Sequence, residues 1–331
     1  MDEFRRRVLR QLGCGLAGSA LGGLATVAHG QDASFPSRPV RVIYPLAPGG
    51  LGDSVGRTLF NAVGQAWKQP VVIDNRPGAG GMIGADAVAK AAPDGYTLLL
   101  TITALVQVPS LVAKAPFDPI RDFAPVSEIA TTHIALMVRP ELPVRTVREL
   151  VEHVRRSGKP LPYGTYGVGS TGHLLMEMFA RQTGMPVTAV AYKGEAPLLT
   201  DMLGGQVNAG FLSATAAAQQ IRAGKLRALA VSGDSRSPLL ANVPTFIQAG
   251  YPEIDGSGWI GLFAPARTPV ALVEKISADV RAALTKTEVR AKLEESGLLL
   301  RGTTPAAFTA AVQQQHAYWA RAIRDSNIRL E

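Results

Sequence analysis

Cysteine is nearly absent from this chain of 331 residues, which has a single one, Cys14, in its leading segment. The rest of the chain therefore offers no disulfide and no thiolate chemistry. Aromatic residues make up 6% and charged residues 18% of the chain. The formal net charge is +8, but the basic residues are scattered among acids and have few aromatic neighbours. Because nucleic-acid-binding surfaces gather basic residues on one face, we expect no nucleic-acid partner.

The sequence also lacks the spacing of a metal site, a solenoid repeat and a low-complexity tract. His133, His153 and His316 have no cysteine or histidine partner at the separations that zinc ligands show. We therefore expect no metal and no cofactor. With 47% hydrophobic residues, the chain has a globular composition and is long enough for two domains of ordinary size.

No apolar run in the leading segment is long enough for a comfortable membrane span, because residues 12–27 are interrupted by glycine. They follow Arg5-Arg6-Arg7-Val8-Leu9-Arg10, which fits a twin-arginine pattern, and precede small residues typical of a cleavage site, Ala28 and Gly30. We predict that residues 1–30 are a signal peptide, with export to the periplasm by the twin-arginine or the general secretory route. An uncleaved anchor is the alternative.

Strands and helices alternate along the remaining chain. We expect strands at 39–45, 71–74 and 96–102, with helices at 54–67 and 82–91 between them. This alternation is typical of a largely parallel sheet with right-handed crossovers. A second α/β block follows and interrupts the first, whose helical tail returns at the end of the chain.

The interrupted order predicts two lobes joined by two chain crossings, near 131–138 and 257–264. Lobe 1 would comprise residues 31–133 and 264–331, and lobe 2 residues 134–263. A two-lobed body with a pair of crossings forms a hinge. Open α/β lobes bind their ligands at the carboxyl ends of their strands, so we expect a cleft between the lobes.

Two glycine-rich turns, residues 47–53 and 167–172, each connect a strand to a helix, one turn in each lobe. Asp53, Ser170 and Thr171 stand where helix caps stand. The first amides of a helix have no internal partner and lie at the positive end of the helix dipole. Such a turn binds an anion without Arg or Lys.

Two other interpretations of the second turn are possible. Its Gly-x-Gly-x-x-Gly pattern, with Glu195 downstream as a ribose-binding acid, fits a dinucleotide site, but Glu195 falls beyond the end of the next strand. An exported serine hydrolase or esterase using Ser170 is the alternative function. Against it, Val168 breaks the Gly-x-Ser-x-Gly pattern, and His173 is too close along the chain to be an independently placed base.

Eleven short motifs follow one another in order along the chain. They are Phe35-Pro-Ser-Arg-Pro39, the Pro-x-x-Pro-Gly-Gly-x-x-Asp pattern at 45–53, Asn75-Arg-Pro-Gly-Ala-Gly-Gly81, Pro93-Asp-Gly-Tyr-Thr97, Phe123-Ala-Pro-Val126, the turn at 163–173, Tyr192-Lys-Gly194, Leu203-Gly-Gly-Gln-Val207, Ala223-Gly-Lys-Leu-Arg-Ala228, Val243-Pro-Thr245 and the segment 259–265. Each motif alone is weak evidence, whereas the ordered set is specific and covers residues 35–327. In this set the chain resembles one family, the Bug-type (TctC-like) periplasmic solute-binding proteins of tripartite tricarboxylate transport systems.

The resemblance implies an α/β, two-lobed periplasmic-binding-protein (Venus flytrap) fold with two interlobe crossings. It also implies a binding protein without enzymatic activity, a small carboxylate ligand in the cleft, and a monomer. Membrane transporter subunits similar to TctA and TctB would be the partners, or a sensor kinase if no transporter accompanies the protein.

The family's ligand-binding positions carry over onto both turns. They fall on Gly49, Gly50 and Asp53 in lobe 1 and on Gly169, Ser170, Thr171 and His173 in lobe 2. For Asp53 a capping role, and for His173 a role in supporting the loop, are the alternatives. Thr101 and Thr103 end a strand that faces the cleft, and Lys193 is the one cation in a candidate loop. For these three residues packing or solvation is the alternative.

Two positions depart from the family's pattern. Leu46 stands where an aromatic residue is common, and Leu212-Ser213 replaces an Asp-Asn pair whose Asp can receive a ligand's ammonium group. We therefore add Leu212 and Ser213 to the candidate ligand-binding residues. The loss of the Asp argues against an amino-acid ligand and favours a mono- or dicarboxylate with an apolar or aromatic body.

Overall fold

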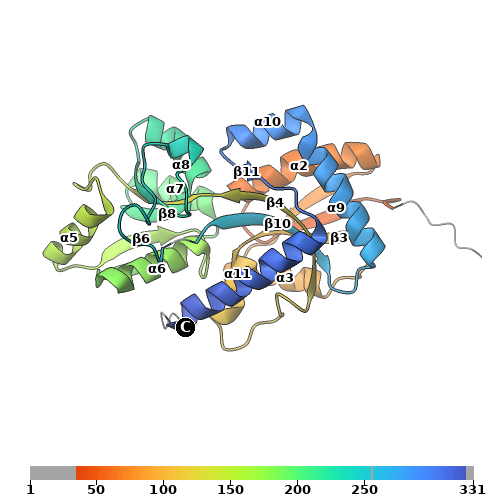
Figure 1. The fold of residues 1–331 in the computed structure, drawn as a ribbon, viewed down its shortest axis with the longest axis horizontal. Helices are drawn as coiled ribbons and strands as arrows, with labels where there is room; N and C mark the ends of the chain where they lie inside the picture. The colour runs from red at the N-terminus through yellow and green to blue at the C-terminus, as the bar shows by residue number, and fades with distance from the viewer. Residues whose placement is uncertain (1–34, 255, 326–331) are drawn as a thin grey trace, which may run out of the picture. The chain divides into compact units, whose positions relative to one another are not determined.

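The computed structural model describes residues 35–254 and 256–325, so the predicted signal peptide at 1–30 lies outside the described residues. The chain from Arg38 onward forms one compact unit, and every element below belongs to it. Two sheets organise this unit. In Figure 1 one sheet and its helices are coloured mainly orange and blue, and the other mainly green.

The first sheet has six strands in the order β11-β4-β10-β3-β1-β2. β1 pairs in parallel with β2 and β3, whereas β10 pairs antiparallel with β3 and β4, and β11 antiparallel with β4. The prediction of a largely parallel sheet is therefore wrong here, because three of the five strand pairings are antiparallel. The strands are β1 (Val40–Tyr44), β2 (Val71–Asn75), β3 (Thr97–Ile102), β4 (Phe123–Thr132), β10 (Gly258–Pro265) and β11 (Leu299–Leu300).

The second sheet has five strands in the order β7-β6-β8-β5-β9. β6 pairs in parallel with β7 and β8, and β5 pairs antiparallel with β8 and β9. The strands are β5 (Ile134–Val138), β6 (Leu161–Thr165), β7 (Val187–Ala191), β8 (Ala209–Ser213) and β9 (Arg227–Val231).

The two chain crossings lie side by side, where β4 and β10 leave the first sheet (Figure 1). His133 alone separates β4 from β5, and Thr132 at the end of β4 pairs with Gly258 at the start of β10. β10 pairs along its whole length within the six-stranded sheet. The first six residues of β10, which a boundary at 263 assigns to lobe 2, therefore lie in the first sheet.

Amphipathic helices cover both sheets. α2 buries Val55, Leu59 and Val63, which repeat at helical spacing. The helices of the first sheet are α2 (Leu51–Trp67), α3 (Met82–Ala89), α4 (Ala104–Gln107), α9 (Val270–Thr285), α10 (Thr287–Glu295) and α11 (Pro305–Asp325). Those of the second are α5 (Val147–Ser157), α6 (Thr171–Thr183), α7 (Glu195–Gly204) and α8 (Ala214–Arg222). Among the described residues, no helix combines the length and apolar character needed to cross a membrane.

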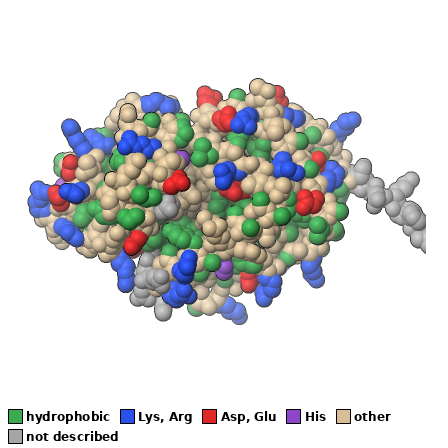
Figure 2. Space-filling model, in the orientation of Figure 1, with side chains coloured by type: hydrophobic (Ala, Val, Ile, Leu, Met, Phe, Trp, Pro, Cys, Tyr) green, Lys and Arg blue, Asp and Glu red, His purple; other side chains and the backbone are tan. Residues whose placement is uncertain are grey.

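Local sequence signals explain several of these helix ends. Thr146 caps α5 by accepting a hydrogen bond from the Glu149 amide, and Glu149 reaches back to the Arg145 amide at 2.7 Å. Gly158 ends the helix in the left-handed conformation. On the face shown in Figure 2, Lys and Arg side chains are interspersed with Asp and Glu.

Candidate functional site

The first glycine-rich turn connects β1 to α2. Gly50 is the N-cap of α2, with an extended backbone (φ −80°), and contributes no side-chain hydrogen bond. Asp53 lies inside the first turn of the helix, so the predicted role of Asp53 as N-cap is wrong. Its carboxylate reaches back to the Gly49 amide at 3.0 Å, as an acid at the third helical position does.

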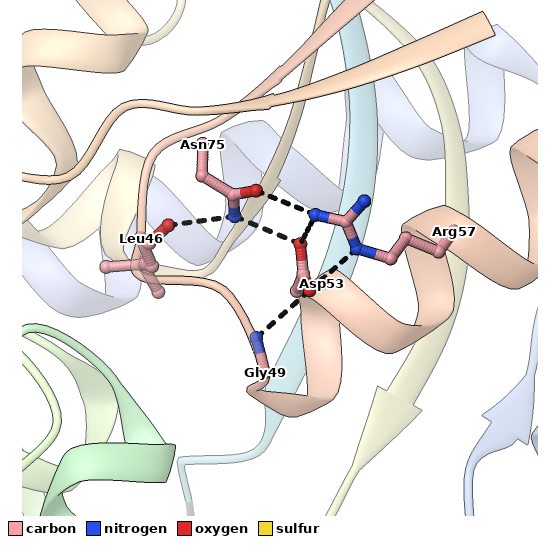
Figure 3. Close-up of polar contacts among 5 residues, drawn as sticks. All are labelled: Leu46, Gly49, Asp53, Arg57 and Asn75. Atoms are coloured by element: carbon pink, nitrogen blue, oxygen red, sulfur yellow. Dashed lines mark hydrogen bonds and ion pairs between the residues drawn. The ribbon is translucent and has the colours of Figure 1, made fainter.

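Asp53 is the centre of a polar network that holds this turn (Figure 3). Its two oxygens accept hydrogen bonds from Nε and Nη2 of Arg57 and from Nδ2 of Asn75, each at 3.0 Å. Asn75 also donates to the Leu46 carbonyl at 3.2 Å. Burial alone would raise the pKa of Asp53, but the hydrogen bonds from Arg57, Gly49 and Asn75 together lower it. The carboxylate therefore positions the turn, with its lone pairs engaged inside lobe 1.

The second glycine-rich turn connects β6 to α6. Ser170 is the N-cap of α6, as the sequence predicts, and its hydroxyl accepts a hydrogen bond from the His173 amide. The same hydroxyl lies 3.1 Å from Oγ1 of Thr165. Thr171 is the first helical residue. Of the first amides of α6, those of Gly172 and His173 have hydrogen-bond partners within lobe 2, the Tyr166 and Ser170 hydroxyls.

The His173 side chain supports this turn through a hydrogen bond. Its Nδ1 accepts a hydrogen bond from the Gly169 amide at 3.0 Å, which leaves the ring proton on Nε2. Burial lowers the pKa of His173, although the nearby Glu177 carboxylate opposes that shift. Gly169 has a φ of +72°, and a Cβ there would lie 2.8 Å from a methyl carbon of Val108, so glycine is required.

Each glycine-rich turn contacts a segment of the opposite lobe. The Ala47 amide donates to the Lys193 carbonyl at 3.0 Å, and Nε2 of Gln107 donates to the Thr171 hydroxyl at 3.1 Å. Gln107 and Thr171 are both buried. These contacts join elements of the two sheets, so the lobes are closed on each other around the turns.

A cavity of about 40 Å³ lies between the lobes at this point. A water molecule needs about 10–15 Å³ on the same measure, so the closed cavity holds only a few. Four helix starts line the cavity: those of α2, α6, α7 and α8. Of the predicted site residues, Gly50, Thr103, Thr171 and Ser213 line it.

Sequence reasoning missed four polar residues of this wall: Tyr44, Thr132, Tyr166 and Glu195. The Tyr166 hydroxyl accepts a hydrogen bond from the Gly172 amide at 3.1 Å. Burial and then the Glu195 charge raise the pKa of both tyrosines, so both stay neutral. Each tyrosine ends or follows a strand just before a glycine-rich turn, and this shared position is the signal that would have revealed them.

Glu195 is the only charged residue among the described residues that line the cavity. It begins α7, directly after Gly194, and its carboxylate accepts hydrogen bonds from the amide and the hydroxyl of Ser213 at 2.6 and 3.0 Å. Burial of the carboxyl group raises its pKa, while hydrogen bonds from Ser213 and from the Leu51 amide oppose that shift. From the sequence, Glu195 is a candidate only for the ribose-binding acid of a dinucleotide site.

A second, more open hollow of about 410 Å³ adjoins the first through Leu46, which lines both. Its wall is largely apolar and includes Met82, Val108 and Val168. Lys193 lies on this wall, so the predicted cation belongs to the outer hollow.

Three other candidates lie away from the cavity wall. Leu212 is fully buried in the core of lobe 2, and since successive strand residues point to opposite faces, Ser213 takes the cavity side and Leu212 the core. The prediction of Leu212 as a ligand-binding residue is therefore wrong for this cavity. Thr101 is buried in β3 opposite Gly261. Gly49 packs near Ala196, where a Cβ would lie 3.7 Å from that side chain.

The site contains no cluster suited to a metal ion, since no group of three or more His, Cys, Asp or Glu among the described residues has the necessary proximity. The site consists of helix-start amides, hydroxyls and one carboxylate. Such groups bind an anion or a hydrogen-bonding organic molecule by non-covalent contacts.

Comparison with known proteins identifies the structural class of this chain. Structural neighbours that cover about 90% of this chain are two-lobed periplasmic binding proteins. The family described as tripartite tricarboxylate transporter family receptor, TctC, matches residues 55–328. The chain belongs to this family, which includes the Bug proteins, and it has the α/β Venus flytrap fold with two interlobe crossings.

Three similar proteins illustrate the relationship. BugT of Bordetella pertussis is 33% identical over 300 residues, which are 90% of this chain and 92% of BugT. R. palustris Rpa4515, solved with adipate, is 34% identical with a TM-score of 0.84 and covers 89% of this chain and 99% of its own. MatC from Rhodopseudomonas palustris, solved with malate, is 31% identical with a TM-score of 0.83, covering 87% and 100%.

Proposed function

We propose that this protein captures a small organic carboxylate between its lobes in the periplasm and delivers it to a membrane partner. The observation that carries the proposal is the convergence of four helix starts, from both lobes, on one cavity. The adipate and malate bound by the similar proteins support the carboxylate class.

The chemistry of capture follows from the cavity wall. A carboxylate in the cavity would accept hydrogen bonds from helix-start amides and from the hydroxyls of Thr103, Thr171 and Ser213. The positive ends of the helix dipoles would balance its negative charge. Micromolar affinity corresponds to about 8 kcal/mol, which several oriented donors and apolar contacts supply together. Because the closed cavity holds only a few water molecules, the lobes must separate to admit the ligand and close on it afterwards.

The outer hollow gives the ligand's body a place beyond the carboxylate. Leu46 connects the two spaces, and the apolar wall beside it suits a hydrocarbon chain or a ring. Lys193 at this wall would pair with a second carboxylate. The ligand favoured by this arrangement is a mono- or dicarboxylate with an apolar body.

In the cell, we expect the protein to be exported and to act with a membrane partner. The partner would be a pair of TctA/TctB-like transporter subunits or a sensor kinase, and the protein would act as a monomer. Residues 1–30 would be removed after export by the twin-arginine or general secretory route. Residues 31–133 with 264–331 and residues 134–263 would move as the two lobes, with the start of β10 counted in the first.

The described geometry does not favour a hydrolase. The Ser170 hydroxyl caps α6 and lies beside Thr165, whereas Nδ1 of His173 accepts from the Gly169 amide. A general base must instead hydrogen-bond to the nucleophile. Ser170 and His173 are therefore parts of the turn, and the protein is proposed to break no bond.

A thermal-shift screen tests the proposed function. A ligand present at 100 times its Kd adds about 2.7 kcal/mol to stability, which raises Tm by several degrees in a protein of this size. We expect mono- or dicarboxylates such as malate and adipate to raise Tm. Stabilisation by amino acids alone would refute the ligand class, and no stabilisation by any anion would refute the proposed function.

A further inference from the structure

We propose that Glu195 is a resident carboxylate that occupies the anion position between the lobes in the unliganded protein, so that a ligand carboxylate must displace it. This inference rests on the proposed function. It assigns Glu195 a role in setting affinity and in holding the empty cleft closed.

The Glu195 carboxylate accepts hydrogen bonds from residues of both lobes. Ser213 is the N-cap of α8 in lobe 2, and both its amide and its hydroxyl donate to the Glu195 carboxylate. Leu51 is the first residue of α2 in lobe 1, and its amide donates to the same carboxylate. One side chain thus takes donors from the helix starts of both lobes.

The loop that carries Glu195 fits against lobe 1. Gly194, the N-cap of α7, has a φ of +142°, which few other residues adopt. A Cβ at Gly194 would lie 3.6 Å from the Ala47 side chain, and the neighbouring Lys193 carbonyl accepts a hydrogen bond from the Ala47 amide. The loop is therefore seated on lobe 1 and holds the Glu195 carboxylate in the cavity.

The cavity wall carries one negative charge, that of Glu195, and no positive side chain among the described residues. No Lys or Arg is found among the described residues that line the cavity, so nothing there neutralises two carboxylates at once. Two like charges sharing a site disfavour each other's ionised form. A ligand carboxylate seeking the Leu51 and Ser213 amides therefore competes with Glu195 both for the donors and through repulsion.

Glu195 is a built-in competitor for the protein's own ligand. It closes the empty cleft with the same contacts that the ligand uses, and its release couples ligand entry to lobe opening. The device keeps weakly binding anions out, because only a guest that makes additional contacts displaces the resident group.

The test compares the wild-type protein with Glu195→Gln and with Glu152→Gln, which removes one charge from the exposed face of α5. Malate and adipate are titrated into each protein by calorimetry. We expect Glu195→Gln to bind the better of the two at least about fivefold more tightly and Glu152→Gln to match the wild type. Weaker or unchanged binding by Glu195→Gln would overturn the inference, since the carboxylate would then contact the ligand or play no part.

Amide hydrogen exchange of the unliganded protein provides a test that needs no ligand. In Glu195→Ala, we expect the amides of Leu51 and Ser213 to exchange at least about tenfold faster than in the wild type, with a similar circular dichroism spectrum. Unchanged exchange at Leu51 would overturn the inference. If no probe binds to any of the proteins, the proposed function fails for these carboxylates, and the exchange result alone decides the role of Glu195.

Discussion

Nε2 of Gln107 lies 3.1 Å from the hydroxyl of Thr171, and this buried hydrogen bond joins the two lobes. Gln107 is the last residue of the short helix α4, which follows strand β3 of the six-stranded sheet. Thr171 is the first residue of α6 at the candidate site. The bond reaches the first residue of a helix whose amides are proposed to hold the ligand. This side-chain pair therefore links lobe closure to the geometry of the binding turn.

Gln107→Ala should remove this link. A buried polar group that loses its partner costs about 1–3 kcal/mol, so we expect a loss of about that size in the free energy of unfolding. Denaturant unfolding of the variant measures it. Gln219→Ala on the exposed side of α8 is the matched control and should change stability by less than about 0.5 kcal/mol. Equal stability of both variants would show that the bond does not hold the lobes.

Asp53→Asn should destabilise the first turn in a pH-dependent way. The hydrogen bonds of Asp53 lower its pKa in the folded protein, so its contribution is present above the unfolded value of 3.8 and is lost as pH falls through the lower folded value. We expect a loss of about 1–3 kcal/mol at pH 7, moderated by the solvent exposure of Arg57, and a smaller difference near pH 3. Urea unfolding of both proteins across this range measures the difference, and a gap that widens toward acid would contradict the expectation.

Glu128→Gln should show the opposite pH trend. Glu128 is buried in β4, and burial raises its pKa although Arg301 opposes the shift. A raised folded pKa stabilises the protein below the unfolded value of 4.5, and this stabilisation is lost as pH rises through the folded value. The neutral variant should therefore gain stability relative to the wild type between pH 4 and pH 7. The charge control Glu152→Gln should show no such trend in the same unfolding series.

Ser170→Ala separates the binding function from the hydrolase alternative. The variant loses the N-cap of α6, which costs about 1 kcal/mol, and we expect weaker carboxylate binding because the helix-start amides become less ordered. The wild-type protein should hydrolyse no ester. Turnover by the wild type that disappears in Ser170→Ala would reverse the functional conclusion.

The elements that depend on local signals could be predicted from the sequence. Glycine-rich turns followed by an apolar helical stripe give the strand–turn–helix units, and the Ser170 cap and the capping box at Thr146 need only their near neighbours. Antiparallel pairing of β10 with β3 and β4 could not be predicted, because it depends on strands far apart along the chain.

Other features of the site were missed for equally physical reasons. A difference of one position along a strand reverses the face of the sheet, which separates Leu212 in the core from Ser213 at the cavity. The N-cap of α2 is Gly50 and not Asp53. Asp53 therefore lies inside the helix, where it is the centre of the polar network that holds the first turn. The Glu195 contact with Leu51 joins residues of different lobes, and no local pattern in either segment indicates it.

The decisive experiment is a crystal structure of the protein with malate or adipate, whichever raises Tm more. We expect a carboxylate group of the ligand between the lobes, accepting hydrogen bonds from helix-start amides of α2 in one lobe and of α6 or α8 in the other. A ligand bound only in the outer hollow beside Lys193, or held by one lobe alone, would contradict it.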